Sequence, residues 1–182
     1  WEPLVTNDEE TGRPAPCLAQ SWEMFDGGRR WRFHLRRGVS FHDGTEFTAD
    51  AVLKNMERLE KGVKPSGFYM LNIRNFYPHL VRAYKLDDYT VEFTFSEPNV
   101  NQLYNMMNFG SAMYAPSCLA EDGNFSREAI GTGPFRIAEN KLGEYVILVR
   151  NEDYYGEKAR AEKIIVRNIP SADVRFSALK TG

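Results

Sequence analysis

The sequence has few of the residues on which catalytic and metal sites depend. Its 182 residues include two cysteines and three histidines. Neither the CxxC spacing of metal and redox sites nor the paired-histidine spacing of helical zinc sites occurs. No GxSxG motif supplies a serine nucleophile, and the Gly-Thr-Gly-Pro segment at 131–134 lacks the GxxxxGK[ST] pattern of a phosphate-binding loop. We therefore expect no catalytic residues, no metal site and no cofactor, and hence no enzyme.

Charge and hydropathy exclude further classes of protein. The 23 basic and 25 acidic residues give a net charge of −2. Because nucleic-acid binding usually depends on an excess of positive charge, this balance does not favour nucleic acid as a partner. No apolar run approaches the roughly 20 residues that a membrane-spanning helix needs. The 12 Phe, 9 Tyr and 3 Trp are too many for an intrinsically disordered chain. The composition therefore predicts a chain that folds around a core.

The two cysteines leave two interpretations open. Cys17 and Cys118 could form a disulfide if the protein is exported. They could instead be two small buried hydrophobic side chains, and this second interpretation is favoured.

Alternating apolar and polar residues predict two strands, at 31–36 and 89–95, the first of them preceded by a turn at Asp26-Gly27-Gly28. Their expected inward side chains are Trp31, Phe33, Leu35, Tyr89, Val91, Phe93 and Phe95. The same alternation directs Glu92 and Thr94 toward solvent, where replacement by alanine should have little effect on stability.

Helix signals are clearest between the two strands. Thr48 has the position of an N-cap, and the spacing of Val52, Met56 and Leu59 predicts a helix over about 48–60 with one buried stripe. Gly62 and Pro65 should end it. Further helices are expected at 99–107, with Asn99 as its cap, and at 172–180, after Ser171. Strands are expected near 135–138, 145–150 and 163–169. The pattern predicts an α+β protein with antiparallel sheets and inserted helices.

Aromatic and methionine residues cluster in two stretches of the sequence. Such side chains pack cores, but they also line pockets for small ligands, and composition does not separate these interpretations. One pair follows a Gly- and Pro-containing break, and three more residues flank Gly110, where the chain turns. We expect these five side chains to form a ligand-binding wall: Phe68, Tyr69, Met106, Phe109 and Tyr114. If they belong to the core instead, alanine substitutions will change stability alone.

Several longer motifs occur in a characteristic order. Together they resemble extracellular solute-binding protein family 5, the peptide, nickel and opine type of ABC-importer receptor. The motifs are Trp1-Glu2-Pro3-Leu4-Val5, Pro16–Glu23, Trp31–Val52, Ile130-Gly131-Thr132-Gly133-Pro134-Phe135 and Arg150–Gly156.

The resemblance implies a lobe of a periplasmic-binding-protein type II-like (class C) fold. Residues 1–10 and 129–182 would belong to the main subdomain of lobe I, residues 11–128 would form a smaller inserted subdomain, and the second lobe would lie outside this chain.

The resemblance also implies a function. The chain would belong to the solute-capturing component of an ABC importer, a monomer that delivers an oligopeptide or a nickel or other metal chelate to the membrane permease. It would be located in the periplasm or at the extracellular face of the cytoplasmic membrane. The alternative is a ligand-sensing domain of a regulatory protein with the same fold.

Overall fold

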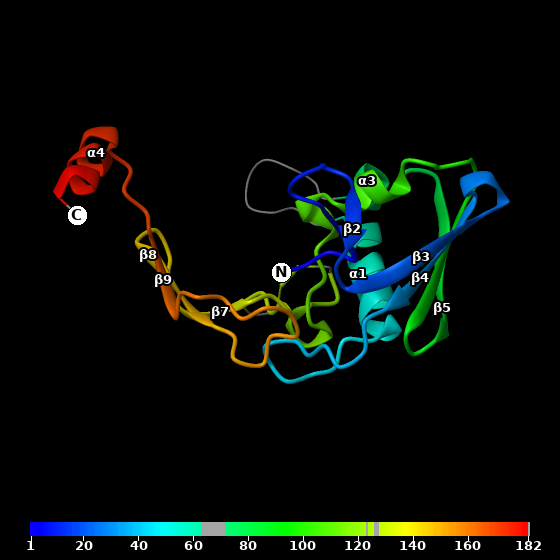
Figure 1. The fold of residues 1–182 in the computed structure, drawn as a ribbon, viewed down its shortest axis with the longest axis horizontal. Coiled ribbons are helices and arrows are strands. Elements are labelled where there is room, and N and C mark those ends of the chain that lie inside the picture. The colour runs from blue at the N-terminus through cyan, green and yellow to red at the C-terminus, as the bar shows by residue number, and fades with distance from the viewer. Residues whose placement is uncertain (63–71, 123, 126–127, 182) are drawn as a thin grey trace. The chain divides into compact units, whose positions relative to one another are not determined.

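The computed structural model describes residues 1–62, 72–122, 124–125 and 128–181. The chain divides into two compact units, Trp1–Thr132 and Gly133–Gly182, whose elements are labelled in Figure 1. The division falls within the Gly-Thr-Gly-Pro segment, where the sequence composition also changes. Residues 1–10 group with the first unit, and their predicted assignment to a main subdomain shared with 129–182 stays a prediction.

A four-stranded antiparallel sheet organises the first unit. Its strands follow the order β3-β4-β6-β5, with β3 at Ala19–Phe25, β4 at Arg30–Leu35, β5 at Leu80–Asp87 and β6 at Thr90–Phe95. A short 3-10 turn, η1 (Asp26–Gly28), joins β3 to β4 as predicted. Trp31 pairs with Phe93 and Phe33 pairs with Val91, so the predicted inward residues of the two central strands share one face.

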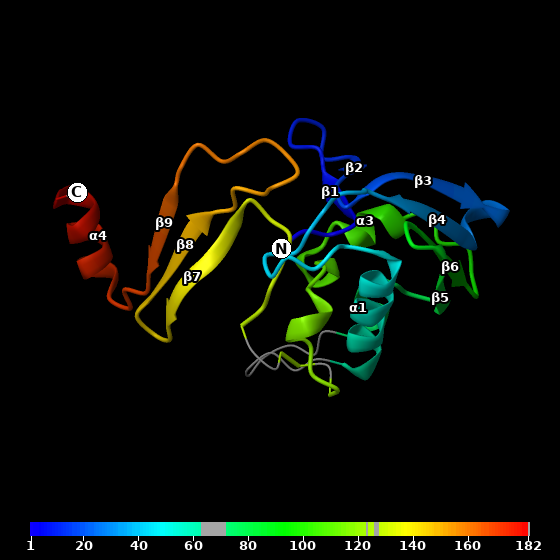
Figure 2. The same ribbon diagram turned by 90° about the horizontal axis from the view of Figure 1, so that it is seen from below.

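Helix α1 (Ala49–Lys61) lies along that apolar face of the sheet (Figures 1 and 2). Val52, Met56 and Leu59 are buried as predicted, and Gly62 ends the helix at a φ of 73°. Thr48 occupies the N-cap position, but its side chain makes no capping hydrogen bond within the described ranges. Pro65 lies outside the described residues.

Shorter elements complete the first unit. They are β1 (Val5–Asn7), β2 (Pro14–Pro16), α2 (Ile73–Phe76), α3 (Gln102–Met106), η2 (Phe109–Ser111) and η3 (Pro116–Cys118). The predicted cap of α3 was wrong: Asn101 is the N-cap. The Asn99 side chain instead donates to Gln102 Oε1 at 2.7 Å, in the interior of the unit.

The second unit is a three-stranded antiparallel sheet followed by a helix. The strands β7 (Phe135–Lys141), β8 (Tyr145–Arg150) and β9 (Lys163–Arg167) pair in sequence order. Helix α4 spans Ala172–Thr181, and the Ser171 hydroxyl accepts from the Val174 amide at 3.4 Å, which confirms the predicted cap. The α+β class predicted from the pattern of elements is therefore confirmed.

Two predictions about single residues need correction. Tyr89 precedes β6 and is only half-buried, since its ring lies under the Arg37 guanidinium and its hydroxyl donates to Glu46. Glu92 was predicted to face solvent, yet it is only 1% exposed. The reason is that Arg32 from β4 and Tyr84 from β5 donate to its carboxylate and cover it.

Both cysteines are thiols in the structure. Cys118 is buried and its sulfur lies 3.1 Å from the Ala115 carbonyl oxygen, while Cys17 is half-buried. The structure therefore fits the favoured interpretation better than a disulfide.

Candidate functional site

The N-terminal tryptophan packs against segments that are distant in sequence. Its indole Nε1 donates to the Ala129 carbonyl at 3.2 Å, and its ring centroid lies 5.8 Å from that of Tyr114. Gly131 lies directly beneath it, where an added Cβ would come within 2.3 Å of the Trp1 ring. Glycine at 131 thus permits the close contact, and 55% of Trp1 remains exposed.

Tyr114 is held in place through its backbone by helix α1. The Asn55 side chain donates to the Tyr114 carbonyl at 2.8 Å and accepts from the Tyr114 amide at 3.1 Å. Asn55 is itself buried and also donates to the Ala51 carbonyl of its own helix. A buried amide that makes all three bonds is satisfied, so α1 fixes the position of the segment around Tyr114.

Arg58 lies behind the Tyr114 ring, one helical turn beyond Asn55. Its guanidinium carbon is 4.9 Å from the Tyr114 ring centroid and 4.8 Å from that of Phe125. The two rings contact each other edge to face at 4.8 Å. Arg58 is 3% exposed, and its burial lowers the pKa of the guanidinium. Burial also raises the pKa of the Tyr114 phenol, while the Arg58 charge acts in the opposite direction.

We call Trp1, Tyr114 and Phe125 the aromatic wall. Trp1 and Phe125 are exposed and Tyr114 is half-buried, so the wall presents flat apolar surface and one phenol. The Trp1 indole N–H is already bonded to the Ala129 carbonyl. Such a surface can bind a small ligand mainly by packing.

Of the five residues predicted to form a ligand-binding wall, the structure describes Met106, Phe109 and Tyr114. Tyr114 belongs to the aromatic wall. Phe109 is 78% exposed and contacts Phe76 edge to face at 6.4 Å, whereas Met106 on α3 has no exposed surface. Burial of Met106 agrees with the core interpretation for that residue. Phe68 and Tyr69 lie outside the described residues, and the ligand role of the set stays a prediction.

Sequence reasoning did not single out three residues of this site. Trp1 and Phe125 are far from Tyr114 in the sequence, and no local pattern connects them. Arg58 lies on the buried face of α1, but a hydrophobic stripe identifies only apolar members of such a face. The signal that could have found it is its position two residues after Met56 and one before Leu59, on the edge of the predicted stripe.

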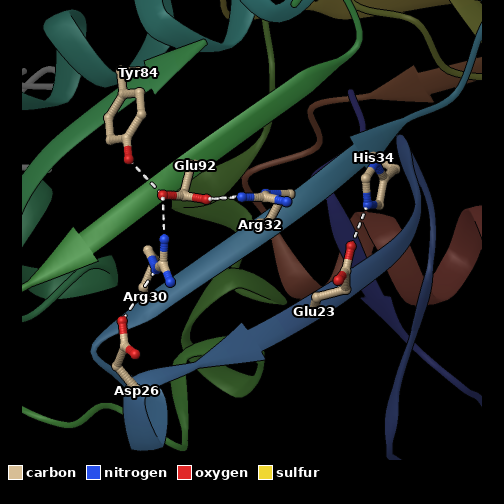
Figure 3. A network of polar contacts seen from close by, with 7 residues as sticks. All are labelled: Glu23, Asp26, Arg30, Arg32, His34, Tyr84 and Glu92. Atoms are coloured by element: carbon tan, nitrogen blue, oxygen red, sulfur yellow. Dashed lines mark hydrogen bonds and ion pairs between the residues drawn. The ribbon is translucent and has the colours of Figure 1, made fainter. Parts of the chain in front are cut away.

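A polar cluster lies on the face of the β3-β4-β6-β5 sheet that is opposite to helix α1 (Figure 3). We call it the Glu92 cluster, and its members are Asp26, Arg30, Arg32, Tyr84 and Glu92. Arg32 donates twice to Glu92 Oε2, at 3.0 and 2.8 Å. Tyr84 donates to Glu92 Oε1, and the Arg30 guanidinium lies 3.6 Å from the same oxygen. Arg30 also pairs with Asp26 at 3.1 Å. The phenol and the two guanidinium groups cover the Glu92 carboxylate, which explains its burial.

The Glu92 cluster joins the strands β4, β5 and β6 through side-chain hydrogen bonds. The Phe25 ring lies 4.8 Å from the Arg30 guanidinium and 5.1 Å from that of Arg32, so it packs against both cations. Both carboxylate oxygens of Glu92 already accept hydrogen bonds from side chains of neighbouring strands, and a buried carboxylate bonded in this way ties those strands together.

Among the described residues, no three His, Cys, Asp or Glu side chains come together as metal ligands. Within the same ranges, no helix is long and apolar enough to cross a membrane. His34 pairs with Glu23 at 2.7 Å (Figure 3).

Comparison with known proteins gives consistent matches along the chain. The family model of bacterial extracellular solute-binding proteins, family 5 Middle, matches residues 13–182. The chain is 31% identical to the probable ABC transporter periplasmic-binding protein SapA of Escherichia coli K12, with 100% of this chain and 37% of the relative covered. It is 32% identical to the nickel-binding periplasmic protein of E. coli K12, with 100% and 34% covered. The chain thus spans about a third of the length of these relatives.

Solved structures show the same fold. NikA from Brucella suis in complex with Fe(III)-EDTA matches with a TM-score of 0.85 and 30% identity, over 100% of this chain and 36% of that one. The periplasmic binding protein DppA from Helicobacter pylori, in complex with the peptide STSA, matches with a TM-score of 0.85 and 31% identity, over 100% and 39%. These matches confirm the type II periplasmic-binding-protein fold expected from the motifs. With the family model matched over residues 13–182, the chain belongs to the bacterial extracellular solute-binding proteins of family 5.

Proposed function

We propose that the protein containing this chain captures a small solute outside the cytoplasm and delivers it to the membrane permease of an ABC importer. The observation that carries the proposal is the family match over residues 13–182. Relatives named as periplasmic proteins for peptide transport, for D,D-dipeptide binding and for nickel binding support it. In this proposal the protein acts as a monomer in the periplasm or at the extracellular face of the membrane, without catalysing a reaction.

The proposed ligand is an oligopeptide or a nickel or other metal chelate. Solved relatives include an example of each class: one holds the peptide STSA and another holds Ni(L-His). The aromatic wall suits either class, because flat rings pack against peptide side chains and against the organic part of a chelate. The regulatory alternative is not favoured, since the named relatives are periplasmic or transport proteins.

The proposed arrangement has two lobes that close over the ligand. Residues 1–10 and 129–182 would contribute to the main subdomain of the first lobe, with residues 11–128 inserted in it. The coverage of about a third of each relative supports this arrangement. The ligand would then contact this chain on one side only.

The test is to identify the ligand carried by the protein. The whole reading frame that contains this chain would be expressed with export to the periplasm, purified without added ligand and denatured, and the released small molecules identified by mass spectrometry. We expect a peptide or a metal chelate in stoichiometric amount, with titration calorimetry confirming its binding to refolded protein. A protein that releases no small molecule and binds neither trialanine nor a nickel–histidine complex contradicts the proposal.

A further inference from the structure

Helix α1 presents two polar side chains to the aromatic wall from its buried face. Asn55 holds the backbone of Tyr114 through its two hydrogen bonds. Arg58 contacts the rings of Tyr114 and Phe125 through its guanidinium. The helix therefore holds the Tyr114 backbone through Asn55 and covers one face of the Tyr114 ring with Arg58.

Arg58 is an unfavourable choice if its role is only to fill space. It is almost completely buried, and its Nε has no hydrogen-bond partner within the described ranges. Burying a guanidinium with an unsatisfied N–H lowers the free energy of unfolding, and two cation–aromatic contacts offset only part of that loss. A methionine would occupy a similar volume without that cost. This loss of stability indicates that the planar cation has a role that an apolar side chain cannot fill.

The planar guanidinium can orient an aromatic ring. A cation over a ring face favours one ring orientation electrostatically, whereas an apolar side chain packs against several. The Phe125 ring, edge to face with Tyr114 at 4.8 Å, packs against the same guanidinium, so the cation and the two rings are in mutual contact. We propose that Arg58, together with Asn55, is a positioning residue that fixes the Tyr114 ring where it meets the ligand. This inference rests on the proposed function, because it assigns Tyr114 a ligand to meet.

A double-mutant cycle tests whether Arg58 acts through Tyr114. The whole protein would be prepared as wild type, Arg58→Met, Tyr114→Ala and the double variant, and its affinity for trialanine and for a nickel–histidine complex measured by calorimetry. We expect Arg58→Met to weaken binding of the ligand about tenfold when Tyr114 is present, and less than about twofold in the Tyr114→Ala background. An equal loss in both backgrounds, or no loss in either, contradicts the inference.

Two further variants separate positioning from a general loss of charge or of stability. Arg58→Lys keeps a cation near the rings and should retain most of the affinity that Arg58→Met loses. Lys54→Met removes a cation from the more exposed side of the same helix, where Lys54 pairs with Glu57, and should leave the affinity unchanged. A loss of affinity for Lys54→Met as large as that for Arg58→Met contradicts the inference.

A ligand-free measurement keeps the inference distinct from the proposed function. Tyrosine carrying ¹³C at Cζ would be followed by NMR through a pH titration, and the Tyr114 signal assigned by its absence in Tyr114→Phe. Because the Arg58 charge opposes the rise that burial causes, Arg58→Met should raise the pKa of the Tyr114 phenol further and change its chemical shift. An unchanged Tyr114 signal overturns the inference whether or not a ligand binds. Failure of wild type to bind either probe counts against the proposed function instead.

Discussion

Glu92 shows how a side chain on the polar face of a strand can become buried. The alternation along 89–95 places it correctly, on the face opposite Val91 and Phe93. However, Arg32 from β4 and Tyr84 from β5 reach across and cover its carboxylate. Its burial is therefore a property of three adjacent strands.

We predict that Glu92→Ala destabilises the protein, in contrast to the small effect expected from the sequence. The substitution removes a buried acceptor of charge-assisted hydrogen bonds, so Arg32 loses the carboxylate it bonds to and Arg30 keeps only its ion pair with Asp26. Because both guanidinium groups are partly exposed, water offsets part of the loss, and we expect the free energy of unfolding to fall by about 1–3 kcal/mol. Urea denaturation of wild type and variant measures this difference.

The control is Thr94→Ala, on the same strand and the same face. Thr94 is more exposed than Glu92 and its hydroxyl donates one long hydrogen bond, at 3.3 Å, to the Arg82 carbonyl. We expect it to change the free energy of unfolding by less than about 0.5 kcal/mol. Equal effects of the two substitutions would show that the Glu92 cluster contributes nothing specific.

The Glu92 cluster also predicts how stability depends on pH. Burial by itself raises the pKa of Glu92, but hydrogen bonds from Tyr84 and Arg32 outweigh it, so the pKa lies below the ordinary value of 4.5. A carboxyl with a lowered pKa in the folded state stabilises the fold above its unfolded pKa. That contribution disappears as the pH falls below 4.5 and through the folded pKa. Glu92→Gln should therefore differ most from wild type at neutral pH and least near pH 2, as measured by denaturant unfolding at several pH values. A constant difference would contradict the prediction.

Among the elements, strand β6 is the centre of the first unit. It pairs with β4 on one side and β5 on the other, and Val91 and Phe93 have no exposed surface. The Phe93 ring contacts those of Phe33 and Tyr77, at 5.5 and 5.6 Å.

We predict that Val91→Asp and Phe93→Asp each unfold the first unit. Either substitution places a carboxylate without a partner in the core, at a cost of several kcal/mol. Circular dichroism and thermal melts of the purified variants test this, with Thr94→Ala again as the control. Retention of a cooperative melt near the wild-type temperature would contradict the observed register of β6.

The contact between η2 and α2 depends on a glycine. A Cβ added at Gly110 would lie 2.0 Å from the ring of Phe76, which is buried. We predict that Gly110→Ala displaces that ring and lowers the free energy of unfolding by about 1–3 kcal/mol through overpacking. Gly110→Ala combined with Phe76→Leu, which makes room for the new methyl group, should lose less than the two single substitutions added together, as measured by urea denaturation. Additive losses would contradict this packing.

For the whole molecule, the proposed two-lobed arrangement makes a prediction about this chain alone. We predict that the isolated 182 residues bind trialanine and nickel salts weakly or not at all, because the chain supplies only one side of the proposed cleft. The protein expressed from the whole reading frame should bind its ligand with micromolar or tighter affinity. Calorimetry on both forms decides this, and micromolar binding by the isolated chain contradicts the two-lobed arrangement.

The sequence by itself determined the most regular elements and the family. Alternation identified β4 and β6, the stripe of Val52, Met56 and Leu59 identified α1, and Gly62 was expected to end that helix, where the structure shows it at a φ of 73°. These features depend on residues a few positions apart, because backbone geometry repeats every two or 3.6 residues. The ordered motifs identified the family for a similar reason, since each motif is a continuous run.

Tertiary structure alone decided what lies around Tyr114 and Glu92. Trp1, Arg58 and Phe125 meet at Tyr114 only because the path of the chain brings four separate segments together. Glu92 is buried only because Arg32 and Tyr84 occupy particular positions in the register of the sheet. A local pattern distinguishes one face of an element from the other, but burial depends on which side chains of other elements cover that face.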